Sequence, residues 1–323
     1  MKKRVGVVLG AMVYAGIMPL FAHAAQIYIN PATGKYPPGV TFPVDVRLDT
    51  GPSQCINAAE VDIAYPADVL QAVAVSDGDS IFSMWVKNPT IYSQYGIISF
   101  VGGLPGGYCG RVPGDPSLSN KLATIYFRFA TSTAAGSSTA PESALLAFLP
   151  GTQATLNDGE GTIAPLTTAG AKYAEILQGQ FAPVDTWQKA LEDDTVPPEP
   201  FAIGVYRDPS LFNNQWFATF STADKQTGID HYEIAEIPPS DLKLPEDQWD
   251  WKRAISPYLL TDQSLTDTIA VRAFDAAGNE RLEEYTPTTT VPKSGYPNAS
   301  VFSYVAILGV IGLVLIQLLL RVF

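Results

Sequence analysis

Hydrophobic and polar positions alternate over several short stretches between residues 26 and 176. The clearest examples are 44–48, 59–65 and 123–129, where apolar residues occupy every second position. Successive side chains of a strand point to opposite faces, so this period predicts strands with one buried and one wet face. Turn residues separate them, as at Pro37-Pro38-Gly39 and Gly102-Gly103. We therefore expect an all-β domain over residues 26–177, built as two stacked antiparallel sheets.

A second set of strand-like stretches follows a connector. Residues 178–200 are rich in proline and acidic residues and predict a semi-rigid extended linker, in which Thr186–Glu192 has room for one or two helical turns. Residues 201–285 then predict a second β-sandwich, with its best alternation at Thr268–Phe274. Within it, Trp249 and Trp251 would point to opposite faces of a strand, leaving at least one exposed.

Two apolar segments at the ends of the chain set its expected location. Residues 1–24 have a basic start, an apolar run and small residues before a processing site, which predicts a secretory signal peptide; an uncleaved membrane helix is the alternative. Residues 301–320 carry no formal charge and leave no polar face, which predicts a transmembrane helix. Residues 286–300 are rich in Thr and Pro and predict a stalk. We expect an exported single-pass membrane protein with extracellular N-terminal domains and a short cytoplasmic C-terminus.

The net charge restricts the classes of partner, and the cysteine content predicts a disulfide. The formal net charge of −12 makes nucleic acid and anionic lipid surfaces poor partners. Cys55 and Cys109 are the two cysteines of the chain, and an even number in an exported protein predicts a disulfide. A catalytic thiol would need a histidine partner, and after signal cleavage only His231 remains, in the other half of the chain.

The residue inventory argues against most catalytic mechanisms. One histidine excludes a histidine-rich metal site and allows at most one imidazole base, so we expect no enzyme. A glycosidase with two carboxylates stays open, because acidic residues are abundant. No cofactor is expected, although calcium is the best candidate ion, with oxygen ligands on two turns at Asp77, Asp79, Asp158 and Glu160. Plain turns are the alternative reading of both segments.

Aromatic residues in the irregular middle of the first domain are candidates for ligand contact. They are Trp85, Tyr92, Tyr95 and Tyr108, whose rings would stack on sugars or anchor a protein partner if they were exposed. Packing in the core is the alternative for each of them.

The first domain resembles the cohesin family. The residues that carry the resemblance are Ile27-Tyr28-Ile29-Asn30-Pro31, Ile56 to Val61, Tyr65-Pro66-Ala67-Asp68-Val69-Leu70, Gly96 to Phe100, Leu122 to Phe127 and Asn157 to Thr162. The resemblance implies a nine-stranded jelly-roll sandwich related to carbohydrate-binding modules. It also implies a dockerin-like protein module, or a polysaccharide, as partner, and a link to polysaccharide catabolism. The cysteine pair and the Gly-rich stretch Gly102–Asp115 depart from the family's pattern, and no contact residue is carried over.

The second domain resembles bacterial immunoglobulin-like or fibronectin type III-like repeats. The segments responsible are Asp194 to Pro198, Gly228 to Ile234 and Ile269 to Asn279. Such domains imply a spacer. We therefore expect a membrane-anchored binding or scaffold protein at the cell surface, and a structural envelope protein without a dedicated ligand is the alternative.

Overall fold

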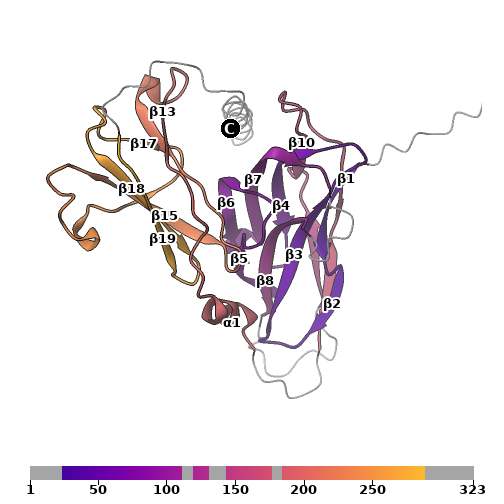
Figure 1. The fold of residues 1–323 in the computed structure, drawn as a ribbon. Coiled ribbons are helices and arrows are strands. Elements are labelled where there is room, and N and C mark those ends of the chain that lie inside the picture. Colours follow the sequence, from indigo (N-terminus) through magenta and orange to yellow (C-terminus); the bar gives the residue numbers. More distant parts are fainter. Residues whose placement is uncertain (1–23, 111–118, 131–142, 177–183, 288–323) are drawn as a thin grey trace, which may run out of the picture.

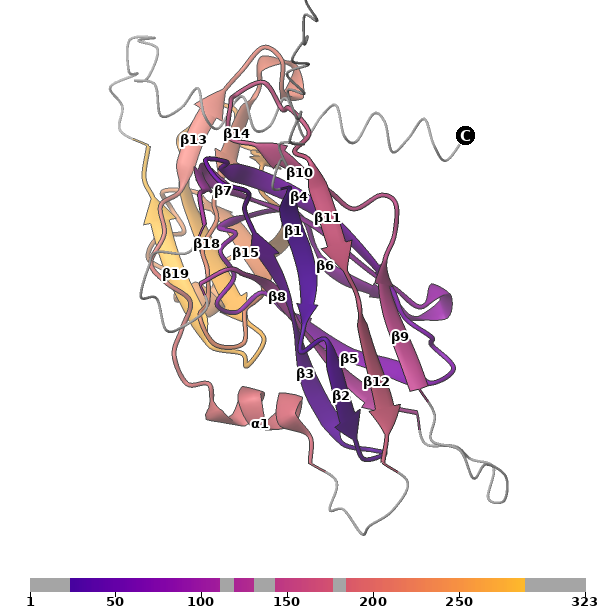
Figure 2. The same cartoon turned by 90° about the vertical axis from the view of Figure 1, so that its right-hand side faces the viewer.

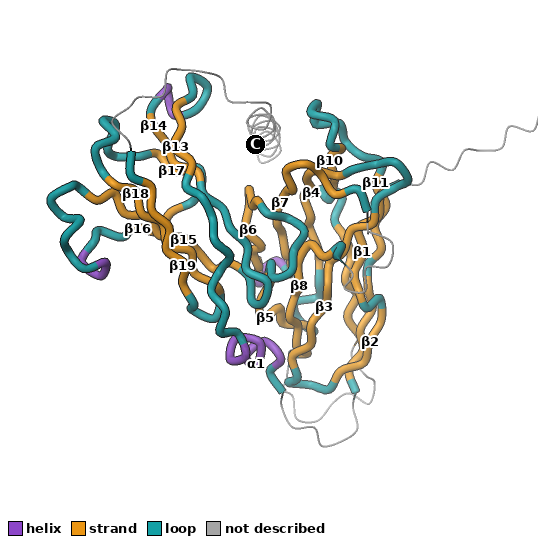
Figure 3. Tube along the Cα trace, viewed as in Figure 1, coloured by secondary structure: helices purple, strands orange, loops and turns teal. Residues whose placement is uncertain are grey.

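The computed structural model describes residues 24–110, 119–130, 143–176 and 184–287. These residues form two β-sandwiches that lie side by side, with a short helix below the space between them (Figures 1 and 3). The predicted all-β class is confirmed. The alternating stretches 44–48, 59–65, 123–129 and Thr268–Phe274 lie in strands, apart from Tyr65. The described part of the first sandwich has twelve strands and not the nine implied by the resemblance, and its sheets are not purely antiparallel, since each contains one parallel pair.

The first sandwich consists of two sheets, and both the N-terminal and the C-terminal segment of the domain contribute a strand to each sheet. One sheet has the order β11-β1-β3-β8-β5 and the other β2-β12-β9-β4-β7-β6, with β10 paired to β4. The first and last segments of the domain each pair in both sheets, β1 and β11 in one and β2 and β12 in the other, and both pairs are parallel (Figure 2). The bounds are β1 Ala25–Asn30, β2 Thr33–Tyr36, β3 Thr41–Asp49, β4 Ile56–Ala64, β5 Leu70–Ser76, β6 Met84–Tyr92, β7 Ile97–Tyr108, β8 Lys121–Phe129, β9 Ser143–Phe148, β10 Gln153–Leu156, β11 Leu166–Ala169 and β12 Ala171–Glu175.

The core of this sandwich is formed by the positions that the sequence pattern places inward. Phe42, Phe100, Phe127 and Tyr173 are fully buried, and Phe42 packs edge-on against Tyr173 with ring centroids 5.4 Å apart. Burial of such side chains stabilises the fold by about 1.5–3 kcal/mol each. Packing of these side chains therefore holds the two sheets together.

A disulfide joins Cys55 to Cys109, as predicted. Cys55 precedes β4 and Cys109 follows β7, and these two strands are antiparallel neighbours. The bond therefore closes one end of the β4–β7 pair.

Part of the predicted linker folds against the first sandwich. Helix α1 (Thr186–Asp193) is capped by Asp185, whose Oδ1 accepts hydrogen bonds from the backbone N–H groups of Trp187 and Gln188. Thr41 Oγ1 in β3 donates to the same oxygen (2.8 Å), and Trp187 packs on Tyr126 of β8 with ring centroids 4.8 Å apart. The helix is thus attached to the outer face of the β3–β8 pair.

The second sandwich has a three-stranded sheet, β13-β14-β17, and a four-stranded sheet, β16-β15-β18-β19. Ala218, Phe220, Ile234 and Val271 lie in the core between them. Assignment of this domain to an immunoglobulin-like or fibronectin type III-like family stays a prediction. The bounds are β13 Gly204–Arg207, β14 Trp216–Thr219, β15 Ile229–Ile237, β16 Lys252–Ala254, β17 Tyr258–Leu259, β18 Thr268–Asp275 and β19 Glu280–Tyr285.

The expectation for Trp249 and Trp251 was wrong. Their ring centroids lie 5.8 Å apart, and both rings pack against Ala235, Ile237 and Ala270 on the outer face of the four-stranded sheet. The reason is a turn: Trp251 N–H donates to the carbonyl oxygen of Trp249 (3.0 Å), so the chain is not extended there. Both indoles are half-buried.

The predicted terminal segments fall largely outside the described residues. This holds for residues 1–23 of the signal peptide, for 288–300 of the stalk and for the membrane segment 301–320. Among the residues that the structure does describe, no helix has the length and apolar character needed to cross a membrane. Signal, stalk and membrane anchor therefore stay predictions.

Candidate binding surfaces

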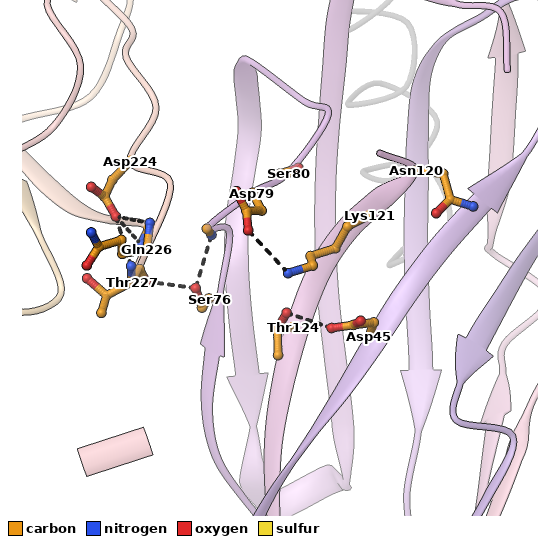
Figure 4. Close-up of polar contacts among 12 residues, drawn as sticks. Asp45, Ser76, Asp79, Ser80, Asn120, Lys121, Thr124, Asp224, Gln226 and Thr227 are labelled. Atoms are coloured by element: carbon orange, nitrogen blue, oxygen red, sulfur yellow. Dashed lines mark hydrogen bonds and ion pairs between the residues drawn. The ribbon is translucent and has the colours of Figure 1, made fainter. Parts of the chain in front are cut away.

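A turn of the first sandwich meets a turn of the second at the junction between them. Ser76 Oγ donates to the carbonyl oxygen of Thr227 (2.7 Å), and Ile229 N–H donates to Asp77 Oδ1 (2.7 Å). Nearby, Ser221 Oγ donates to the carbonyl oxygen of Ser83 (2.6 Å). Figure 4 shows Ser76 facing Thr227 across this contact. The two domains are therefore joined by hydrogen bonds besides the covalent linker.

Two glycines permit this close approach. A Cβ at Gly78 would overlap the carbonyl oxygen of Gln226, and a Cβ at Gly228 would overlap Oδ1 of Asp77. Gly228 also has a φ of 85°, a conformation that favours glycine. The two backbone segments at the junction therefore lie so close together that there is no room for a Cβ at either glycine.

Asp77 is the ionisable group at the centre of the junction. Its pKa is raised to about 7, chiefly by burial and to a smaller extent by the nearby carboxylate of Asp224, while the hydrogen bond from the Ile229 N–H acts in the opposite direction. A cleft of about 240 Å³ opens beside it and is lined in part by Asn88, Trp187 and Asp230. The junction is therefore acidic, with one aromatic ring at its margin.

Three buried carboxylates lie behind the junction in the second sandwich. Asp194, Asp224 and Asp275 each offer an oxygen within 4.8 Å of the others. Hard cations prefer such oxygen ligands. Each group is also used by the fold: Asp194 accepts from Thr227 Oγ1 (2.6 Å), Asp224 from three successive backbone N–H groups, and Asp275 from Asn279. Burial raises the pKa of Asp275.

This group was missed by sequence analysis because its members come from separate segments. Asp194 and Asp275 lie in the stretches that resemble immunoglobulin-like repeats, and Asp224 precedes the third such stretch by four residues. This location in or beside the three stretches was the one feature of the sequence that could have indicated the group. The spacing of the three aspartates did not indicate it, since each comes from a different turn or linker.

None of the predicted calcium candidates belongs to this group of three carboxylates, although Asp77 lies near Asp224. Asp77 serves the domain junction, and exposed Asp79 lies 3.9 Å from Lys121 Nζ (Figure 4). Asp158 and Glu160 lie on an exposed turn, where Glu160 N–H donates to Asp158 Oδ1. Neither segment belongs to a group of three potential metal ligands among the described residues.

The four predicted contact aromatics divide into two pairs. Trp85 packs edge-on against Phe82 and Phe100, and Tyr108 is 8% exposed, so both belong to the core or its margin. Tyr92 is 37% and Tyr95 69% exposed. The structure therefore leaves Tyr92 and Tyr95 available to a partner, at the turn between β6 and β7.

His231 has neighbours that account for its position in β15. Its ring stacks on Phe274 with centroids 4.8 Å apart, and Nδ1 lies 2.5 Å from Asp230 Oδ2. Nε2 is 3.8 Å from Glu233. These contacts fix the imidazole against the sheet.

Helix α1 packs on the sheet of β3 and β8, whereas no described helix packs on the outer face of the β9-β4-β7-β6 sheet. Leu145 of β9 is 64% exposed, and Ala147 beside it is also exposed. Glu60 of β4 is held by Gln153 Nε2 (2.8 Å). At the other side, Lys87 Nζ donates to Ser99 Oγ (2.7 Å) and lies 5.1 Å from the ring centroid of Tyr92. This open face combines fixed charges with exposed apolar groups.

Comparison with solved structures finds cohesin domains, the family that the sequence resembles. They include a type I cohesin–dockerin complex from Clostridium thermocellum (14% identity, 47% of this chain and 94% of that chain, TM-score 0.37). A non-cellulosomal cohesin from the archaeon Archaeoglobus fulgidus matches with 16% identity over 47% and 91% (0.35). The seventh ScaB type I cohesin from Pseudobacteroides cellulosolvens matches with 17% identity over 49% and 96% (0.38). No protein-family model and no curated protein match the chain.

Proposed function

We propose that the protein binds another protein module through the open face of the β9-β4-β7-β6 sheet. The observation that carries the proposal is the contrast between the two outer faces. Helix α1 packs on β3 and β8, whereas the opposite face presents Leu145, Ala147 and the held carboxylate of Glu60. Side chains fixed before binding lose little further entropy when a partner docks, which favours specific recognition.

The partner that we propose is a dockerin-like module, and the role is that of a non-catalytic scaffold. The predicted signal and membrane segments would place the first sandwich outside the cell, with the second sandwich and the stalk as spacers. In that setting the protein would hold a partner, for example one linked to polysaccharide degradation, away from the membrane. A polysaccharide bound directly on the same face is the variant that the test below separates.

Binding assays with the full-length chain in a nonionic detergent test the proposal. The panel contains dockerin modules encoded in the same genome and a polysaccharide array. Leu145→Asp should abolish capture of the module, because it places a charge in the exposed apolar part of the face. Thr168→Asp, at an exposed strand position on the other sheet, is the control and should bind normally.

Two outcomes would contradict the proposal. Equal loss in both variants would show that the open face is not the docking surface. Absence of any bound module or glycan, together with concentration-dependent self-association of the chain, would favour the structural envelope role instead.

A further inference from the structure

A hollow lies on the outer face of the second sandwich, far along the chain from the open face. It has a volume of about 630 Å³ and is formed between the loop 238–251 and the sheet edge at β19. Its apolar part consists of Leu242 (44% exposed), Leu244 (41% exposed) and the half-buried Trp249. We call it the acidic hollow, for the carboxylates described next.

Carboxylates outnumber cations around the acidic hollow. Glu280 and Glu284 of β19 and Glu246 and Asp247 of the loop line it, against one cation, Arg272. Arg272 is already engaged: its Nη2 pairs with Glu233 (2.5 Å), Nη1 lies 3.8 Å from Glu280, and its guanidinium lies over the ring of Trp251 at 3.9 Å. The local field is therefore negative.

The loop that exposes the two leucines is held in place. Trp251 Nε1 donates to the carbonyl oxygen of Glu246 (2.8 Å), Leu244 N–H donates to the carbonyl of Asp241, and Gln248 N–H to that of Pro245. Both tryptophans pack on the sheet beneath. The leucines are thus exposed by a fixed loop, and fixed apolar groups with a polar rim are typical of interaction sites.

Trp249 adds an independent sign of an incomplete site. Its indole N–H is buried in the lining of the hollow and has no hydrogen-bond partner among the described residues. Buried donors of this kind are rare in folded proteins.

We infer that the acidic hollow binds a basic amphipathic segment of a partner protein, in which lysine or arginine alternates with leucine-like residues. Its apolar side chains would contact Leu242, Leu244 and Trp249, while its cations would pair with Glu280 and Glu284. The charge of the rim selects this occupant: an acidic segment would be repelled, and a neutral one would leave the carboxylates unused. The inference concerns the second sandwich and does not depend on the function proposed for the first.

Isothermal titration of the full-length chain with synthetic peptides tests the inference. The probe is an end-capped alternating lysine–leucine peptide, compared with an all-lysine peptide and an alternating glutamate–leucine peptide of equal length. We expect saturable 1:1 binding of the first alone. Its affinity should fall as sodium chloride rises from about 0.05 to about 0.3 M, because the rim is solvent-exposed.

Variants locate the binding. The double variant Glu280→Gln/Glu284→Gln should weaken it about tenfold, and Leu244→Ser about threefold to tenfold. The control Glu283→Gln/Glu192→Gln removes two carboxylates outside the hollow and should change affinity less than about twofold. Near-UV circular dichroism verifies that each variant is folded.

Three results would overturn the inference. The first is equal weakening by the hollow variants and the charge-matched control, which would assign the binding to the net charge of the whole chain. The second is failure of the lysine–leucine peptide to bind, and the third is binding of the all-lysine peptide with the same affinity.

Discussion

The backbone N–H of Ile229 donates a 2.7 Å hydrogen bond to Oδ1 of Asp77, and this bond links the two sandwiches. The carboxyl lies where burial opposes ionisation, which raises its pKa to about 7 from an ordinary value of 3.8. A bond between domains is thus made by a group that titrates near neutral pH.

The protein should therefore become less stable as pH rises from about 4 to about 7. In that range folded Asp77 keeps a proton that the unfolded chain has released, so its contribution to the free energy of unfolding is full below about pH 4 and declines up to about pH 7. Asp77→Asn keeps an oxygen for Ile229 N–H and does not ionise. Urea unfolding at several pH values should show the variant more stable than wild type by about 1–3 kcal/mol at pH 8 and equal to it at pH 4. Asp79→Asn, at an exposed neighbour, should keep the wild-type dependence; the same slope in Asp77→Asn would contradict the assignment.

Gly78→Ala should separate the two sandwiches. The new Cβ would overlap the carbonyl oxygen of Gln226, and backbone must move to accommodate it, at a cost of about 1–3 kcal/mol. Small-angle scattering should show a larger radius of gyration and a broader distance distribution. Gln226→Ala is the control, since it keeps the carbonyl and removes only an exposed side chain. Unchanged scattering in Gly78→Ala would mean that the junction tolerates a methyl group.

Loss of the disulfide should destabilise the first sandwich. Cys55 and Cys109 are 54 positions apart, and in the chain-entropy model the closed loop contributes about 4 kcal/mol. Cys55→Ser/Cys109→Ser should lower the free energy of unfolding by about this amount in urea. The unreduced, denatured wild type should show no thiol reactive to a maleimide. Two reactive thiols would refute the bridge.

Alternation predicted β3, β4 and β8 of the first sandwich because the core between the two sheets buries one face of each strand. Val44, Val46 and Leu48 are fully buried, as expected. Two positions on the wet side are buried as well, Arg47 and Thr124, because both bond to Asp45. A period-two pattern predicts which face of the sheet each side chain lies on. It does not predict that polar side chains on the outer face will bury one another by hydrogen bonding.

Contacts between segments that are distant in the chain could not be predicted from the sequence. Nothing in Ser76 or Thr227 indicates that they meet, and the docking of α1 depends on Thr41, far from Asp185 in the chain. The acidic hollow was missed for a related reason. The sequence pattern predicts strand positions for Trp249 and Trp251, whereas a turn places both on one side of the sheet.

Asp185→Ala should detach helix α1 from the first sandwich. The carboxylate accepts the N–H groups of Trp187 and Gln188 and the hydroxyl of Thr41, and its loss should cost about 1–2 kcal/mol. Hydrogen exchange in residues 186–193 should become faster. Asp185→Asn keeps an acceptor and should be milder. Glu192→Ala, exposed on the same helix, is the control, and equal effects of Asp185→Ala and Glu192→Ala would contradict the capping role.

Arg272→Ala should release the loop 238–251 while leaving the sandwich folded. The guanidinium lies 3.9 Å from the ring centroid of Trp251 and pairs with Glu233, so the variant loses a cation–π contact and leaves a half-buried carboxylate without its cation. We expect a loss of about 2 kcal/mol and a red shift of tryptophan emission as the indoles become wetter. Arg272→Lys keeps the charge without the planar group, so its stability and emission should lie between those of Arg272→Ala and the wild type.

The position of the loop also controls the shape of the acidic hollow, so Arg272→Ala should weaken binding of the lysine–leucine peptide although it removes a positive charge. Tighter binding in that variant would show that charge alone, and not the shape set by the loop, selects the ligand.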